Sequence, residues 1–216
     1  SALKRSTAKR REPASLSERQ LIDAGLALIR REGTDKFSMR RLAKELGVTP
    51  MAVYYYVKSK DEMFELLADA VMSRVERAAP GSGDWRAQLK VTSLNAFKLL
   101  CEYPGLSGQI VKQPPTHHAE QMSTYGTAIL IDAGYPPATA ARIITTCQSF
   151  MYGMIGLQAQ IERAKRVKQP TRVSTAYLAQ LDAYDIVAAG LDALLAGLAA
   201  QLPKPVRTPK RRPRAS

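Results

Sequence analysis

The stretch from Ser38 to Lys60, SMRRLAKELGVTPMAVYYYVKSK, constrains the fold of this chain more than any other. Gly47 stands where a helix ends in a left-handed C-cap, Thr49 can cap the start of a new helix, and Pro50 suits its first position. Two helices joined by so tight a turn cross at a steep angle, which predicts a helix-turn-helix. The first of them carries apolar residues at the spacing of one helical face: Met39, Leu42, Ala43 and Leu46.

A third helix precedes this pair. Ser17 and Gln20 form a capping box that predicts its start, and Gly33 marks its end. Phe37 lies between the predicted helices, where it can fill the core that they share. We therefore expect residues 16–60 to form a three-helix head, preceded by a flexible basic arm over residues 1–15.

The rest of the chain reads as helices separated by glycine and proline, with no competing strand pattern. We expect an all-α fold, in which the head is followed by a larger helical regulatory and dimerisation domain over residues 61–202 and a basic tail over residues 203–216. A connecting helix over 61–79 opens this domain, and the turn-rich segment 80–84 follows it. Further helices are predicted over 85–102, 116–133, 137–166 and 181–202, with one short helix between 105 and 114 and a loop over 165–175.

The last predicted helix has a regular apolar seam with alternating steps of three and four residues, which is typical of helices that pack against a partner. The partner can be the long helix before it, or two copies of that helix pair can form a dimeric four-helix bundle. The candidate dimer-interface residues are Leu181, Tyr184, Ala188, Leu191, Leu195 and Leu198.

The net charge of +13 is concentrated at the two ends of the chain. Residues 1–60 contain 14 Lys/Arg and 6 Asp/Glu, residues 203–216 contain 6 and none, and residues 61–202 contain 12 and 13. This distribution is expected if the head meets phosphates while the middle of the chain does something else. For the tail alone, a merely solubilising role is the alternative.

Several classes of protein and site are disfavoured. The sequence has no HExxH, G-x-S-x-G, P-loop or GxGxxG motif, so we expect no enzyme and no cofactor. It has no run of eighteen apolar residues and no secretory signal, which predicts a cytoplasmic protein without a membrane partner. Cys101 and Cys147 lie in apolar helical patterns as inert thiols, and the adjacent His117 and His118 point in different directions, so we expect no metal site.

Residues 17 to 66 resemble the N-terminal domain of the TetR family of bacterial transcriptional repressors, and the later helices resemble its regulatory half in number and order. The family's Gly-Val turn, its Leu-Tyr-x-His-Phe-like run and its Ser-Lys pair correspond here to Gly47-Val48, Val53-Tyr54-Tyr55-Tyr56-Val57 and Ser59-Lys60. Tyr56 in place of histidine and Val57 in place of phenylalanine depart from that pattern. The Val-Lys-x-Lys ending is closer to the tetracycline-repressor branch.

The resemblance implies that Tyr54 and Tyr56 contact DNA phosphates and that Lys60 adds a charged contact, as a helix N-terminus also would. Arg40 is the expected guanine reader. Arg41 and Lys44 can serve phosphates or simply form a solvated face, and Tyr55 is open between base edge and backbone. Apolar base contacts are expected from the start of the recognition helix, namely Thr49, Pro50, Met51 and Ala52.

The regulatory half should hold a ligand cavity lined by amphipathic side chains among aliphatic ones. The candidates are Trp85, Phe97, Tyr103, His117, Tyr125, Gln148, Tyr152 and Gln158. We therefore expect a homodimeric repressor that binds a palindromic operator in double-stranded DNA and is released by a small-molecule inducer. The alternative is an architectural DNA-binding protein that uses its basic arms and has no inducer.

Overall fold

A computed structural model describes residues 16–79, 82–110, 115–167 and 173–201. Within these ranges the regular structure is helical and no strand occurs, which confirms the all-α prediction. The elements are α1 (Glu18–Glu32), η1 (Thr34–Lys36), α2 (Met39–Leu46), α3 (Pro50–Tyr54), α4 (Lys60–Met72), α5 (Trp85–Cys101), α6 (Leu106–Ile110), α7 (His117–Asp132), α8 (Pro137–Lys165), α9 (Val173–Leu178) and α10 (Ala183–Gln201). The expected basic arm and basic tail lie outside the described residues.

The head is built as its local signals predict. Ser17 and Gln20 form the capping box of α1. Gly47 ends α2 with φ 67°, and the side chain of Thr49 accepts a hydrogen bond from the Ala52 N–H at 3.3 Å, which starts α3. The Phe37 ring is buried in the shared core, with its centroid 5.2 Å from that of Phe64 on α4. These caps fix the angle at which α3 leaves α2.

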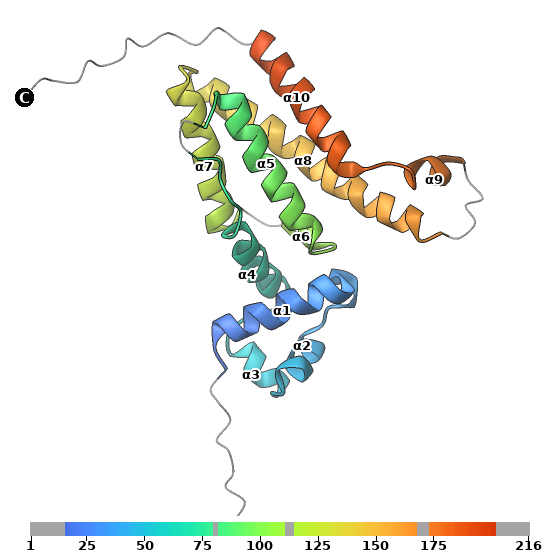
Figure 1. The fold of residues 1–216 in the computed structure, drawn as a ribbon. Coiled ribbons are helices and arrows are strands. Elements are labelled where there is room, and N and C mark those ends of the chain that lie inside the picture. The colour runs from blue at the N-terminus through green and yellow to red at the C-terminus, as the bar shows by residue number, and fades with distance from the viewer. Residues whose placement is uncertain (1–15, 80–81, 111–114, 168–172, 202–216) are drawn as a thin grey trace, which may run out of the picture.

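Helix α4 lies between the head and the rest of the molecule (Figure 1). It packs against α1 on one side and against α5, α6 and α7 on the other. It ends at Met72, whereas a helix to residue 79 was expected. Beyond it, side chains of α5 bind the backbone of the next residues: Thr92 accepts from the Ala78 N–H, and Asn95 donates to the Glu76 carbonyl. This segment is therefore a strap on α5 and not a continuation of α4.

Helices α5, α7, α8 and α10 form the body of the molecule, and α10 packs along α5 and α8 (Figure 1). Leu191 and Leu195 of α10 are 0% and 2% exposed within this single chain. Both side chains lie on the face of α10 that packs against α5 and α8 of the same chain. This corrects the expectation that they form the dimer interface. The short helix α9 begins within the segment 165–175, which was expected to be a loop, and extends beyond it to Leu178.

Head and body also touch directly, at the end of α5. The Arg30 guanidinium of α1 lies 4.9 Å from the centre of the Tyr103 ring and donates to its hydroxyl at 2.8 Å. The Thr34 N–H donates to the Pro104 carbonyl at 3.0 Å. Tyr103 is 2% exposed in this contact, so it is a joint between head and body and not a lining residue of the cavity described below.

Candidate nucleic-acid interface and internal cavity

The short helix α3 exposes large apolar and aromatic side chains to solvent. Met51 is 78% exposed, Tyr55 is 85% exposed and Tyr54 is 44% exposed. Val53 is fully buried and holds the helix to the head's core. Burying apolar side chains is the normal outcome of folding, so these exposed ones favour a surface that meets a partner. Pro50 is exposed as well, and Ala52 is half-buried at the edge of this surface.

The three tyrosines differ in their surroundings. Helix α3 ends at Tyr54, so the run does not continue as a regular helix. The Tyr56 hydroxyl donates to the backbone carbonyl of Leu16, and its half-buried ring packs against the core. The Tyr55 ring stands edge-on to it at 5.5 Å. Tyr54 and Tyr55 are therefore free to meet DNA, whereas Tyr56 ties the chain before α1 to the recognition helix.

The predicted basic contacts also separate into two groups. Arg40 and Lys44 on α2 are exposed, and no ion pair links either to a described carboxylate. Arg41 forms an ion pair with Glu32 and donates to the Lys36 carbonyl, so it braces the head. Lys60 is exposed at the first position of α4, where the helix dipole favours anions.

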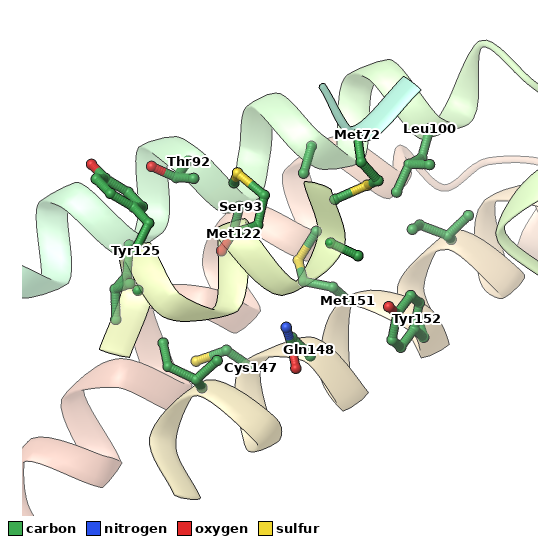
Figure 2. A pocket seen from close by; sticks show the side chains of 16 residues that line it. Met72, Thr92, Ser93, Leu100, Met122, Tyr125, Cys147, Gln148, Met151 and Tyr152 are labelled. Atoms are coloured by element: carbon green, nitrogen blue, oxygen red, sulfur yellow. The ribbon is translucent and has the colours of Figure 1, made fainter. Parts of the chain in front are cut away.

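A cavity of about 770 Å³, counted with its open mouth, lies in the body between α5, α7 and α8 (Figure 2). Three methionines from different helices face it: Met72 of α4, Met122 of α7 and Met151 of α8. Its other linings are Leu89, Thr92, Ser93, Ala96, Leu100, Ala119, Tyr125, Gly126, Ile144, Cys147, Gln148, Tyr152 and Ile155.

Of the predicted lining residues, Tyr125, Gln148 and Tyr152 line this cavity and the other five lie elsewhere. Trp85 packs edge-on against Tyr135 at 5.5 Å, and Tyr103 joins head and body. Phe97 and Gln158 line a separate crevice beside α10. His117 is exposed at the start of α7, 2.9 Å from the side-chain nitrogen of Gln121. The sequence prediction failed for these five because aromatic and amide side chains also serve core packing and surfaces.

Two side chains of the cavity wall form hydrogen bonds with the segment that follows α4, and we call this pair of bonds the clasp. The Ala78 N–H donates to the Thr92 hydroxyl at 3.0 Å, and the Ala78 carbonyl accepts from the Tyr125 hydroxyl at 2.7 Å. Ala78 is 6% exposed, so both of its backbone groups depend on these two side chains. Thr92 comes from α5 and Tyr125 from α7, and both line the cavity. The same side chains thus meet the cavity and the end of the connecting segment.

Burial controls ionisation inside the cavity. It raises the pKa of the Cys147 thiol to about 11 and raises the pKa of the Tyr152 phenol. Both shifts disfavour charge, as expected in a site poor in water. The Gln148 side-chain nitrogen donates to the Ser123 hydroxyl at 2.6 Å, which fixes the amide on the cavity wall.

Two contacts between Asp69 and His118 join α4 to α7. The Asp69 carboxylate accepts from the His118 N–H at 2.8 Å and lies 2.7 Å from its ring Nδ1. Burial acts to raise the pKa of Asp69, but the hydrogen bonds from the His118 backbone and ring outweigh burial, and the net pKa is lowered. The carboxylate is therefore held in its charged form, and the start of α7 is tied to the connecting helix.

The chain is similar to known regulators along most of its length. Residues 21–67 match the family pattern described as "Bacterial regulatory proteins, tetR family", and residues 77–202 match that described as "Tetracyclin repressor-like, C-terminal domain". The transcriptional repressor DrrR1 of Streptomyces coeruleorubidus is 35% identical over 88 residues, which are 40% of this chain and 33% of that protein. This chain therefore spans only a third of that relative.

Two further likenesses extend over nearly the whole chain. The class E tetracycline repressor protein of Escherichia coli is 24% identical over 207 residues, which cover 91% of this chain and 97% of that protein. The crystal structure of a TetR variant from Acinetobacter baumannii in complex with minocycline has a TM-score of 0.71 and 23% identity, and the match covers 86% of this chain and 97% of that one. At this identity the structural likeness shows the fold.

Proposed function

The chain belongs to the TetR family of bacterial regulatory proteins, which are DNA-binding regulators and not enzymes, and from that premise we propose that it is a ligand-released repressor. It binds a palindromic operator as a homodimer in the cytoplasm, and a small molecule in the body's cavity releases it. The observation that carries this proposal is the placement of α4. Its first residue, Lys60, stands at the exposed side of the head, and its last residue, Met72, lines the cavity.

The DNA-facing side of the head is α3 with the exposed face of α2. Phenol groups such as those of Tyr54 and Tyr55 can donate to phosphates while their rings pack on sugars, and Lys60 adds a charge. Arg40 is the side chain in this region best suited to read a guanine, and Met51 is suited to a thymine methyl. Backbone contacts therefore outnumber base contacts, so the spacing of two heads would supply part of the specificity.

A homodimer is favoured by the surface of α10. The segment Ala183–Ala200 is long and apolar enough to pass for a membrane span by composition, yet only 22% of it is buried. Its exposed positions include the small residues Ala189, Ala193 and Ala196, together with Asp185 and Asp192. The outward face of α8 has Gly153 and Gly156, where an added Cβ would meet nothing within 4 Å. Such faces let a second copy's helices approach closely and form a four-helix bundle.

Release follows from the clasp around Ala78. A ligand that occupies the cavity presses on Met72 and on the Thr92 and Tyr125 side chains that hold Ala78, and so shifts the end of α4. The two heads would then no longer match successive major grooves. A nearly complete switch needs the ligand to prefer the released form by about 5.5 kcal/mol.

The test is selection of bound sequences from random DNA, followed by anisotropy titration on the selected site at several salt concentrations. We expect a palindrome, binding by two protomers and a steep loss of affinity with salt. Binding by one protomer that is indifferent to sequence would overturn the proposal. Removing residues 1–12 and 204–216 distinguishes the architectural alternative, because an operator-specific repressor keeps its sequence preference without them.

A further inference from the structure

The cavity of the body has a lining that selects a class of ligand. Among the residues that the structure describes, the sixteen that line it include no Asp, Glu, Lys, Arg or His. Most of their side chains end in methyl groups or sulfur. An ionised ligand would leave its hydration shell without gaining a charged partner, which costs several kcal/mol. Carboxylates, phosphates and ammonium groups are therefore disfavoured inside.

The polar groups of the wall are few and neutral. Thr92 and Tyr125 already bind the backbone of Ala78. Ser93 and Tyr152 form no side-chain hydrogen bond to another described residue, and with the Gln148 amide they are the polar groups that remain to meet a ligand. They suit one or two hydroxyl, carbonyl or ether groups on an otherwise apolar molecule.

The three methionines give the wall its adaptability. Met72, Met122 and Met151 reach the same space from α4, α7 and α8 (Figure 2). Thioether side chains are flexible, fill irregular gaps and make favourable contacts with aromatic rings. A wall of this kind fits a flat ring system. Because Met72 is the last residue of the connecting helix α4, a ligand that packs against it contacts that helix.

From this lining we propose that the inducer is an uncharged aromatic molecule that has few polar groups and packs against Met72, Met122 and Met151. The proposal rests on the ligand-released function proposed above and adds the chemical class of the ligand. It also distinguishes this cavity from a site for an ionised inducer, because its lining has no Asp, Glu, Lys, Arg or His.

A matched pair of fluorescent probes tests the class of ligand directly. N-phenyl-1-naphthylamine is neutral at pH 7.5, and 1-anilinonaphthalene-8-sulfonate has the same rings with one added sulfonate. Titrated into the full chain without DNA, the neutral probe should bind at least about 30-fold more tightly than the anion. The comparison uses only the part of probe binding that is lost in variants whose cavity is filled by a larger side chain.

Two variants fill the cavity from two different helices, Ala96→Phe on α5 and Ala119→Phe on α7. Each should weaken binding of the neutral probe by more than about tenfold, while Val91→Phe, at an exposed position of α5, should not. Helical circular dichroism checks folding, and if one filled variant fails to fold, the other decides.

Three outcomes would overturn the inference: equal cavity binding of the anion, no binding of the neutral probe, or binding that neither filled variant reduces. None of these outcomes depends on operator binding, because the DNA titration measures that binding separately. A failure of the proposed function would appear in that titration while the probe comparison stayed as expected.

Discussion

The hydroxyl of Tyr125 donates a 2.7 Å hydrogen bond to the backbone carbonyl of Ala78. Tyr125 belongs to α7 and lines the cavity, whereas Ala78 belongs to the strap that joins α4 to α5. Thr92 holds the N–H of the same residue. Two residues that line the cavity, Thr92 and Tyr125, therefore hold the segment that follows the connecting helix α4.

Loosening this clasp should cost stability and weaken operator binding. Tyr125→Phe is expected to lower the free energy of unfolding by about 1 to 3 kcal/mol, because it leaves the buried Ala78 carbonyl unpaired. Thr92→Val should cost a similar amount, because it leaves the buried Ala78 N–H unpaired. Urea denaturation and operator titration measure both effects. Tyr177→Phe, at an exposed position of α9, is the control, and an equal loss in that variant would contradict the assignment.

The DNA-facing residues should divide into two behaviours. Tyr54→Phe removes the hydroxyl for which we propose a phosphate contact and should weaken binding similarly on all sequences, whereas Arg40→Ala should relax preference at one base position by about 1 to 3 kcal/mol. Titration against the selected site and its single-base variants separates the two patterns. The reverse pattern, with Tyr54 controlling base preference, would show that the roles are exchanged.

Tyr56 provides a matched comparison within the same run. Its hydroxyl is bound to the Leu16 carbonyl, so Tyr56→Phe should lower stability by about 1 kcal/mol. The salt dependence of DNA binding should stay as in the parent chain. A loss of DNA affinity as large as that in Tyr54→Phe, with unchanged stability, would show that Tyr56 contacts phosphate after all.

The bond between Asp69 and His118 should make stability depend on pH in a defined direction. The pKa of Asp69 is lowered in the folded state, so its contribution is present above the ordinary value of 3.8 and is lost as pH falls through the lower folded value. Asp69→Asn should therefore be less stable than the parent chain at neutral pH, and the two should converge in acid. Denaturation at pH 7 and below pH 3.8 measures this, and a constant difference would refute the coupling.

The outward face of α10 should carry the contact between two copies. Ala193→Arg places a charged side chain on an exposed position of that face and should convert a dimer into a monomer without unfolding the chain. Light scattering after gel filtration reads the mass. Ala27→Arg, at an exposed position of α1 in the head, is the matched control and should leave the mass unchanged.

Local signals allowed most of the helix boundaries to be predicted from the sequence. The capping box at Ser17, the left-handed Gly47 and the cap at Thr49 act over three or four residues. All of the interacting groups are therefore neighbours in the sequence and can be recognised there. The predicted end of α4 was wrong by seven residues because its cause is tertiary: Thr92, from another helix, accepts from the Ala78 N–H that a longer helix would use.

The cavity shows the same division. Tyr125, Gln148 and Tyr152 were predicted from their amphipathic character, but the methionines and Thr92 were not, because nothing in the sequence says that four separate helices turn these faces toward one space. Likewise the regular seam of α10 correctly indicated a partner, yet packing decided that Leu191 and Leu195 face α5 and α8 of the same chain. The sequence by itself determined the helices, the head and the family, since these depend on local spacing and motifs. Only the tertiary structure decided what each face meets, since burial depends on residues far apart in the chain.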